Sequence, residues 1–398
     1  MRQAYESALT FKLTAGYPCA VLVPETCRRD EPRKNRQTMK THAIVQRGPR
    51  RLEYVQLPLP ETLAPDEALV RVEGCGICGT DYERYEGSLG HIPELIPGHE
   101  PVGRIERIGD SAAQRMQLKV GDRVAVQPHY GCGVCAYCVE GMFQLCARKI
   151  NLGLSPLSEG CGLWGGFAEH MMLKGNAIVH RMPDSLPIED AVMFNPLGAG
   201  FEWAITSAGT RVGDDVLIFG PGQRGLACVI AAVIAGANRI VVTGLQKDAY
   251  KLELARSLGA TEVVAVDPAD PASLARALEG QRFDRVIDVT PVATQPILDA
   301  IALVRPGGTI VLAGLKGNTR TVALRPDDLV MDGIEIKGVR GISTRSYGLA
   351  VRAICSGAYD FSAWHTHTMA LKDAELAIRI LAGEVRQGPE PLHITIVP

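Results

Sequence analysis

Two patterns of apolar residues divide the chain. Between about Thr41 and Met193, short β-type apolar runs are broken by Gly and Pro, and they read HAIVQ, EALVRVEG, VGRIERIG, DRVAVQ, FAEHMML and AIVHRM. Short runs at this spacing are typical of antiparallel sheets that twist and partly close. The first half of the chain is therefore predicted to be an antiparallel β-domain.

From about Val212 the rhythm changes to strand-like runs that alternate with helical segments. DDVLIFG is followed by the turn GPGQRG and the apolar segment LACVIAAVIAGA, and five more runs follow: NRIVVTG, TEVVAV, FDRVIDV, TIVLAG and IEIKGV. Six strands alternating with helices predict a parallel, doubly wound sheet with helices on both faces. After about Arg340 the chain is expected to rejoin the first domain through its final run, HITIVP.

Residues 1–38 follow neither pattern. Their weak apolar segment YPCAVLV precedes the charged run RRDEPRKNR, which is the reverse of the order in a secretory signal. MKTHAIVQRG, from Met39, resembles the opening of a first strand. Residues 1–38 are therefore predicted to be a disordered extension, or a segment added upstream of the natural start.

Length and charge narrow the class of protein. A chain of 398 residues with 46% hydrophobic and 22% charged residues suits a soluble protein of two domains. The net charge of -2, with both signs interspersed, offers no basic stripe for nucleic acid. No apolar run approaches the roughly 20 residues needed to cross a bilayer. Neither nucleic acid nor a membrane is an expected partner.

Four of the eleven cysteines form a compact array. Cys132, Cys135, Cys138 and Cys146 have the spacing C-x2-C-x2-C-x7-C, which can close a tetrahedral shell of thiolates around a structural zinc ion. An iron–sulfur cluster or free thiols are the alternatives. Because no secretory signal precedes them, metal binding is favoured over disulfides, and a reducing, cytoplasmic setting is expected.

The turn GPGQRG carries the dinucleotide-binding spacing G-x-G-x-x-G between a predicted strand and a predicted helix. Gly220 would permit the tight turn, Gly222 the approach of a pyrophosphate, and Gly225 close packing of the helix. The helix N-terminus would supply free N–H groups for the anion.

The second strand of this unit lacks the usual acidic residue. Gly244 stands where a carboxylate would bind the ribose hydroxyls of NAD, and Lys247 could attract the 2′-phosphate of NADP. Asp248 could still reach a ribose hydroxyl if its loop bends back. The sequence leaves NAD and NADP both open.

A second metal site is predicted around Cys78 in GCGICGTD and the pair His99 and Glu100 in PGHE. A thiolate, an imidazole and a carboxylate, each expected at the end of a strand, would leave zinc an open position for a substrate oxygen. The Thr80 hydroxyl could pass a proton from a substrate alcohol towards solvent. Alone, such residues are more often packing residues, but a dinucleotide fold favours the metal site.

These motifs together resemble the zinc-dependent alcohol dehydrogenases of the medium-chain dehydrogenase/reductase superfamily. GICGTD, PGHEPVGRIERIG, the four-cysteine lobe, GGFAEHM, GPGQRG and VRPGGTIVLAG occur in that order from about Met39 to the C-terminus. The site resembles the polyol and threonine dehydrogenase branch most. The resemblance implies a GroES-like β-barrel catalytic domain (39–195 and 341–398) with a structural zinc lobe near 131–147. It also implies a Rossmann NAD(P)-binding domain (196–340) and assembly as a dimer or tetramer.

The resemblance also implies residue roles, with one departure. Cys78 and His99 match catalytic zinc ligands, Thr80 matches the proton-relay hydroxyl, and Glu100 matches a carboxylate that ligates zinc in some members. The third ligand, elsewhere Cys, Glu or Asp, is Asn195 in this chain. Cys78, His99 and Glu100 are therefore interpreted as the zinc ligands, with two negative charges to balance Zn²⁺. Asn195 would orient a water or contact substrate.

Two alternatives for Asn195 stay open. Asn195 precedes Pro196 and could be an ordinary turn residue. The catalytic zinc could also be weak or absent, as in members of the superfamily that reduce activated double bonds.

The predicted activity is hydride transfer between an alcohol and NAD(P). Aromatic residues gather near the motifs that would form the cleft, which favours a bulky or aromatic substrate over a polyol, although core packing explains them equally well. They are Tyr82, Tyr85, Trp164, Phe194, Phe201 and Trp203. The competing functions are a zinc-independent ene or quinone reductase and a non-enzymatic dinucleotide-binding protein.

Overall fold

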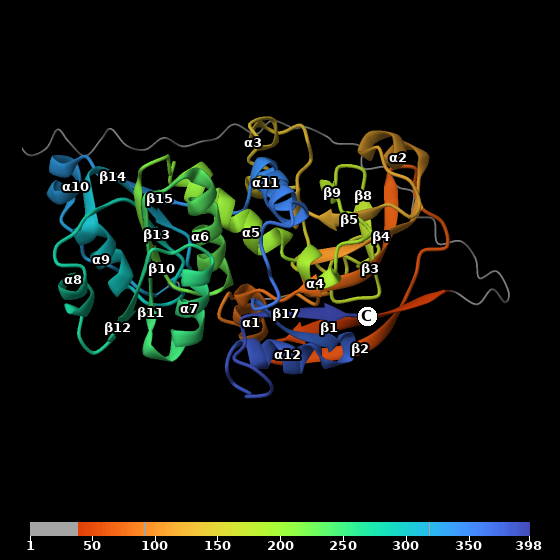
Figure 1. The fold of residues 1–398 in the computed structure, drawn as a ribbon. Helices are drawn as coiled ribbons and strands as arrows, with labels where there is room; N and C mark the ends of the chain where they lie inside the picture. The colour runs from red at the N-terminus through yellow and green to blue at the C-terminus, as the bar shows by residue number, and fades with distance from the viewer. Residues whose placement is uncertain (1–38, 91–92, 318) are drawn as a thin grey trace, which may run out of the picture. The chain divides into compact units, whose positions relative to one another are not determined.

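The computed structural model describes residues 39–90, 93–317 and 319–398 (Figure 1). Its antiparallel region contains a seven-stranded sheet. The strands of this region are β1 (Lys40–Gly48), β2 (Arg51–Pro58), β3 (Glu67–Gly76), β4 (Glu100–Ile108), β5 (Arg123–Val126), β6 (His129–Tyr130), β7 (Ile150–Asn151), β8 (His170–Lys174), β9 (Val179–Arg181), β16 (His365–Ala370) and β17 (His393–Val397). All six predicted β-type runs contain a strand. The predicted extension, residues 1–38, lies outside the described residues.

The order of this sheet is β16-β17-β3-β4-β5-β9, and β8 also pairs with β3. Every pairing is antiparallel except that of β16 with β17. Strand β17 pairs with the end of β3, where Thr395 lies opposite Gly76. The last strand, blue in Figure 1, therefore returns to the strands near the start of the described chain, as HITIVP predicted.

The parallel sheet has six strands in the order β12-β11-β10-β13-β14-β15. Its strands are β10 (Asp215–Phe219), β11 (Arg239–Leu245), β12 (Glu262–Val266), β13 (Phe283–Asp288), β14 (Val304–Leu312) and β15 (Glu335–Gly338). All neighbours run parallel. The connecting helices are α6 (Gln223–Ala235), η3 (Gln246–Asp248), α7 (Ala249–Ser257), α8 (Ser273–Ala277), α9 (Gln295–Leu303) and α10 (Pro326–Asp332). The predicted doubly wound sheet is confirmed.

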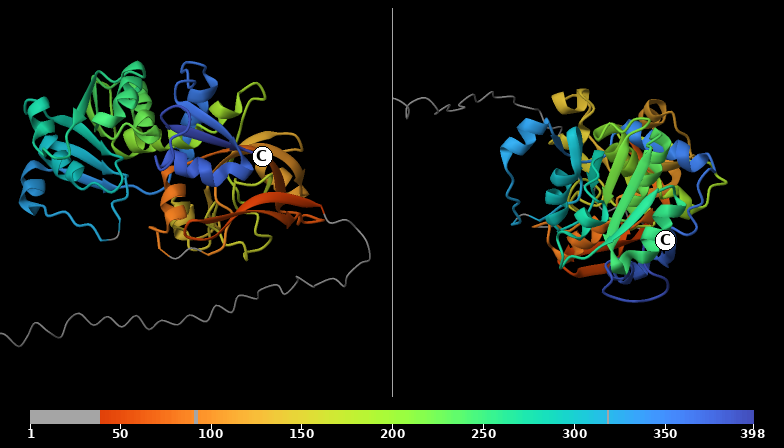
Figure 2. Two further views of the ribbon diagram at one scale, coloured as in Figure 1. Left: turned by 90° about the horizontal axis from the view of Figure 1, so that it is seen from below. Right: turned by 60° about the vertical axis from the view of Figure 1, so that its left-hand side comes forward.

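Helices cover both faces of the parallel sheet (Figure 2). Successive residues of a strand point to opposite faces. On β10, Val216 and Ile218 therefore belong to a core with residues of α6, while Leu217 and Phe219 belong to another with residues of α8 and α9. Because the central strands β10 and β11 are buried on both faces, they are largely apolar, which is why the sequence pattern predicted them well.

A continuous helical segment follows strand β9 and helix α4 (Ile188–Ala191). Helix α5 (Phe194–Gly200) continues directly into the π-helix η2 (Phe201–Ser207). The other helices of the antiparallel region are α1 (Gly79–Glu86), α2 (Asp110–Met116), α3 (Ala136–Val139), η1 (Phe143–Leu145), α4 (Ile188–Ala191), α11 (Thr344–Cys355), η4 (Leu371–Asp373) and α12 (Ala374–Leu381). Asn195 lies inside α5 and is 1% exposed, so it is not an ordinary turn residue. The predicted domain boundaries, one of which falls within α5, stay predictions.

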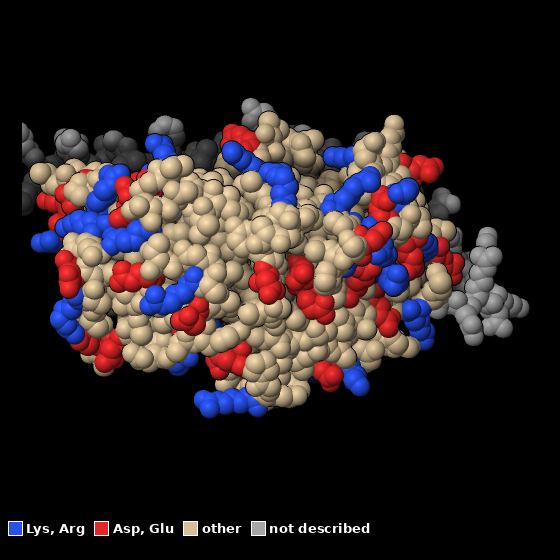
Figure 3. All heavy atoms as spheres, viewed as in Figure 1, with Lys and Arg blue, Asp and Glu red and all other residues tan. Residues whose placement is uncertain are grey.

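The surface carries both signs of charge. On the face shown in Figure 3, Lys and Arg side chains are interspersed with Asp and Glu. Within the described part of the chain, no helix is long and apolar enough to cross a membrane.

Candidate active site

Three potential metal ligands converge where β3 ends and β4 begins. Gly76 lies opposite Glu100 in the antiparallel register, and Cys78 caps the N-terminus of α1. The Cys78 thiol, a His99 ring nitrogen and a Glu100 carboxylate oxygen all lie within 4.8 Å of one another. The prediction that each residue ends a strand was wrong for His99 and Glu100. Antiparallel pairing instead brings the start of β4 to the end of β3.

Glu100 is completely buried, and neither carboxylate oxygen is hydrogen-bonded within the described structure. Burial, together with the charge of Cys78, raises the pKa of Glu100 to about 8. A cation, Arg224, lies close, with its Nη2 3.6 Å from Oε1, but a buried carboxylate without a hydrogen bond is costly. A divalent metal would satisfy it, so the donor set of thiolate, imidazole and carboxylate fits zinc.

Asp81 fixes the geometry of this ligand set, a role that the sequence reasoning missed. One oxygen of its buried carboxylate accepts the Cys78 backbone N–H at 2.9 Å, and the other lies 3.3 Å from His99 Nδ1. His99 Nε2 is then left to face Glu100, whose Oε1 lies 3.9 Å away. Carboxylates behind a ligating imidazole fix its tautomer and orientation. The available signal was the Asp of CGTD.

Arg224 also enters the site, and the sequence reasoning missed it too. It is the second residue of α6 and lies within the turn GPGQRG, where a charged residue was the only signal. Its Nη2 lies 3.0 Å from Cys78 Sγ. Burial alone would raise the pKa of Cys78, but Arg224 and His99 together lower it to about 6.

Asn195 is hydrogen-bonded on both sides of its amide. Its Oδ1 accepts a hydrogen bond from Arg224 Nη2 at 3.4 Å, and its Nδ2 donates to Tyr347 Oη at 3.2 Å. Both partners are side chains, so the amide is held in place. Tyr347, on α11, was also missed, because nothing in the sequence places it beside residue 195.

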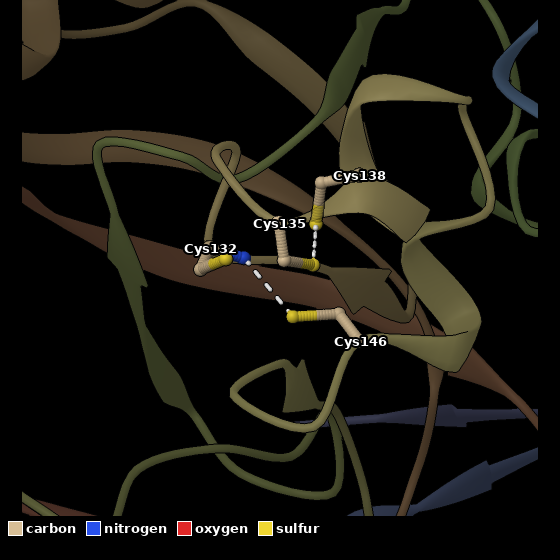
Figure 4. A group of neighbouring side chains, drawn as sticks. All are labelled: Cys132, Cys135, Cys138 and Cys146. Atoms are coloured by element: carbon tan, nitrogen blue, oxygen red, sulfur yellow. Dashed lines mark hydrogen bonds between the residues drawn. The ribbon is translucent and has the colours of Figure 1, made fainter. Parts of the chain in front are cut away.

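The four cysteines of the lobe point towards a common centre (Figure 4). Their sulfurs all lie within 4.8 Å of one another, and those of Cys135 and Cys138 are 3.5 Å apart. The Cys132 N–H donates to Cys146 Sγ at 3.4 Å. Tetrahedral zinc, with Zn–S bonds of about 2.3 Å, separates its sulfurs by about 3.8 Å. The lobe therefore fits a structural zinc ion.

The three motif glycines have the geometry that a dinucleotide turn requires. Gly220 has a φ of +100°, which side chains rarely adopt. A Cβ at Gly222 would have no neighbour within 4 Å, which leaves its backbone open to a ligand. A Cβ at Gly225 would overlap the Gly220 carbonyl oxygen. The N-terminus of α6 begins immediately after Gly222.

The loop after β11 offers a free cation and no free acid. A Cβ at Gly244 would lie 2.8 Å from the Pro221 ring. Asp248 Oδ2 accepts the Leu245 N–H at 3.0 Å, and its Oδ1 lies 3.5 Å from Lys251 Nζ, so this carboxylate is engaged within its own loop. Lys247 is exposed and forms no ion pair with a described residue.

A single cavity of about 950 Å³ joins these groups. Its lining includes Cys78, Thr80, His99 and Asn195 at one part and Gly220, Gly222, Gly225, Gly244 and Lys247 at another. Of the six aromatic residues predicted near the cleft, Trp203 lines this cavity. Tyr85, Trp164, Phe194 and Phe201 lie in hydrophobic cores, and Tyr82 packs against one of them. The aromatic clustering was therefore mostly core packing.

Comparison with known proteins matches both halves of the chain. The family model "Alcohol dehydrogenase GroES-like domain" matches residues 64–184, and "Zinc-binding dehydrogenase" matches residues 225–355. A probable alcohol dehydrogenase of Mycobacterium tuberculosis is 40% identical over 361 residues, which cover 89% of this chain and 98% of that protein. Sorbitol dehydrogenase of Bacillus subtilis is 31% identical over 352 residues, covering 86% and 93%.

Solved structures share the fold. A putative zinc-binding dehydrogenase from Sinorhizobium meliloti, solved with NADP bound, superposes with a TM-score of 0.77 over 90% of this chain and 100% of its own, at 24% identity. The relatives act on CH–OH groups, and the fold and the family models agree with the sequence matches. The chain therefore belongs to the zinc-dependent alcohol dehydrogenases of the medium-chain dehydrogenase/reductase superfamily, in the branch of the polyol dehydrogenases, and is an enzyme.

Proposed function

We propose that this enzyme interconverts a bulky, largely apolar alcohol and its carbonyl form with NADP, using zinc held by Cys78, His99 and Glu100. One observation carries the proposal: these three residues line or adjoin the same cavity as the glycine turn of α6. Hydride transfer requires the substrate carbon and the cofactor to meet in one place.

When bound, zinc would supply a Lewis acid for the substrate oxygen, and NADP would supply the hydride acceptor. Cys78, His99 and Glu100 would hold the metal, and Asp81 fixes the His99 ring with Nε2 on the side of Glu100. Thr80 lies on the cavity wall two residues after Cys78, where its Oγ1 receives the substrate proton and passes it towards solvent.

The loop after β11 supports NADP as the preferred cofactor. Asp248 is occupied by the Leu245 N–H and Lys251, so it is not available to the ribose hydroxyls. The missing side chain at Gly244 removes the carboxylate that would repel a 2′-phosphate. Exposed Lys247 lines the cavity at the same loop and can pair with that phosphate.

The apolar part of the cavity wall supports an apolar substrate. It includes Leu89, Leu154, Trp203, Ile342 and Tyr347, and the polar residues Glu83, His129 and Asn151 line the same cavity. An unpaired hydroxyl against the apolar side chains costs free energy, which disfavours a polyol there.

The test is a panel of alcohols with either cofactor, followed by nicotinamide absorbance on protein of measured zinc content. We expect kcat/KM to be higher for a benzylic or terpenoid alcohol than for sorbitol, and higher with NADP⁺ than with NAD⁺. A reversed ranking of the alcohols would contradict the substrate class. Reduction of activated double bonds by protein lacking the second zinc would favour the competing reductase activity.

A further inference from the structure

Arg224 meets the proposed catalytic ligands through one guanidinium nitrogen. Its Nη2 lies 3.0 Å from Cys78 Sγ, 3.4 Å from Asn195 Oδ1 and 3.6 Å from Glu100 Oε1. The thiolate and the carboxylate are the two anions that would balance Zn²⁺. One cation of the chain is thus already paired with both of them.

Neighbouring side chains fix the position of the Arg224 guanidinium. Its Cζ lies 5.4 Å from the centroid of the Trp203 ring, and only 23% of the Arg224 side chain is exposed. Stacking on an aromatic face while donating from the edge is the geometry that guanidinium favours. Tyr347 Oη accepts from Asn195 Nδ2, which turns the amide oxygen towards Arg224.

The role of Asn195 follows from these contacts. A neutral amide accepts one hydrogen bond from the guanidinium without adding a third negative charge to the site. Asn195 is thus an acceptor for Arg224 beside the two anionic ligands, and it helps to hold the guanidinium there.

We propose that Arg224 competes with zinc for Cys78 and Glu100, so that the catalytic metal site is weaker than these ligands alone would make it. The inference rests on the proposed zinc site. Zn²⁺ with one thiolate and one carboxylate is neutral, and the Arg224 cation that contacts both of these ligands repels the ion. Two further carboxylates lie near: Asp81, behind the imidazole at Nδ1, and Glu83, on the cavity wall. Neither forms an ion pair with Arg224 in the described structure, so they do not keep it from Cys78 and Glu100.

The cysteine lobe provides the contrast. Arg148 Nη2 donates to Cys132 Sγ at 3.2 Å, so an arginine touches a thiolate there as well. Four thiolates around Zn²⁺ carry a net charge of -2, and Arg148 reduces that charge. A cation at the lobe is therefore compatible with the metal, whereas Arg224 repels it.

The test measures zinc affinity, not activity. The full chain would be titrated against a chelator of known zinc affinity, comparing wild type with Arg224→Met, which keeps most of the side-chain length and removes the charge. We expect the weaker of the two sites to bind zinc at least about tenfold more tightly in Arg224→Met, or about 1.4 kcal/mol. Arg224→Lys, which restores the charge, should return the affinity most of the way to that of wild type.

The lobe serves as the internal control. Its zinc affinity should stay within about threefold in Arg224→Met, since the polar contacts of Arg224 in the described structure are with Cys78, Asn195 and Glu100 and with no lobe cysteine. Arg148→Met, the matched change at the other arginine–thiolate contact, should not tighten either site. If Arg224→Met loses the lobe zinc through misfolding, Arg224→Gln replaces it under the same expectation.

Two results would overturn the inference in different ways. A second zinc that binds equally well or more weakly in Arg224→Met would refute the competition and leave the zinc site standing. A second zinc that binds to neither wild type nor any Arg224 variant would refute the proposed function itself, and the competition with it.

Discussion

At the scale of single residues, the geometry of the site depends on polar side chains that fix the orientation of other polar side chains. Asp81 fixes the His99 imidazole, and Tyr347 fixes the Asn195 amide. Asp81, Asn195 and Tyr347 are buried, and an unpaired polar group there costs more than the hydrogen bond itself contributes. The consequence is that substitutions at these positions act on geometry as well as on chemistry.

Asn195→Ala tests whether this residue touches the metal. We expect the variant to keep two zinc ions per chain, because Cys78, His99 and Glu100 remain. Its free energy of unfolding should fall by about 1–3 kcal/mol, because Tyr347 and Arg224 lose a buried partner. Elemental analysis and denaturant titration give the two values.

The matched control is Asn238→Ala, since Asn238 makes an exposed hydrogen bond to Asp215. A change below about 0.5 kcal/mol is expected there. Loss of one zinc from Asn195→Ala would show that the amide is a ligand after all.

Lys247→Ala tests the cofactor loop. We expect kcat/KM for NADP⁺ to fall about tenfold or more, because a charge-assisted hydrogen bond to the 2′-phosphate is lost. The value for NAD⁺ should stay nearly constant, since NAD⁺ lacks that phosphate. Lys251→Ala is the control, because Lys251 is already paired with Asp248 and should affect NADP⁺ less. Equal losses with both cofactors would contradict the assignment.

At the scale of elements, the site depends on close packing between α5 and α6. A Cβ at Gly200, at the end of α5, would overlap the Ala227 carbonyl and lie 2.6 Å from the Ala227 side chain on α6. Asn195 on α5 and Arg224 on α6 can meet only because these helices approach so closely. Packing of the elements thus determines whether the two residues reach each other.

Gly200→Ala should therefore destabilise the protein by about 1–3 kcal/mol through overpacking and raise KM or lower kcat by shifting α5. Gly348→Ala is the matched control, because it too replaces a helical glycine, and its new Cβ would meet only an Arg352 nitrogen at 3.6 Å. It is expected to stabilise by about 0.5–1 kcal/mol through helix propensity. Calorimetry or denaturant titration compares the two, and equal stabilities would contradict this account of the packing.

Strands and helices were predictable where the local pattern of apolar residues determines them. All six parallel strands and six antiparallel runs were identified from the sequence, because short apolar runs bounded by turn residues report buried strands directly. Strands β2 and β16 were not, since their residues are mostly half-exposed and their apolar pattern is weak. The two-residue strands β6 and β7 were also missed, because they are too short to show a pattern. The helix around Asn195 was also not predicted, because Asn-Pro locally resembles a turn, whereas tertiary packing makes this segment helical.

The site was predictable only in part, for a related reason. Motif spacing identified Cys78, His99 and Glu100, and the structure brings them together. Arg224 and Tyr347 could not be placed, because each reaches the site from a segment distant in sequence, on α6 and α11. Likewise, the aromatic residues near the motifs suggested a pocket, but side-chain direction places most of them in cores.

At the scale of the whole molecule, the two proposed metal sites would have different roles, one in stability and one in catalysis. The four-cysteine lobe contains only short helices, α3 and η1, and the two short strands β6 and β7 adjoin it. Such a segment has little regular structure to support it, so a closed metal shell can supply its folding free energy. The Cys78 site lies instead beside the paired ends of β3 and β4, so the sheet supports its backbone.

Cys146→Ser tests whether the lobe zinc stabilises the lobe independently of the second zinc. We expect loss of one zinc per chain, faster proteolysis within residues 132–146, and retention of the second zinc. Cys161→Ser, at an exposed cysteine outside both ligand groups, is the control and should change neither value. Limited proteolysis with mass spectrometry and elemental analysis would report both, and an unchanged zinc content in Cys146→Ser would contradict the lobe assignment.

The central claim is that Cys78, His99 and Glu100 hold a catalytic zinc separate from the lobe. The most direct measurement is zinc content per chain in wild type and in Cys78→Ala, with turnover recorded on the same samples. The account predicts two zinc ions in the active wild type, and one, with turnover lost, in Cys78→Ala. One zinc ion in both, with the lobe intact and turnover retained, would contradict it.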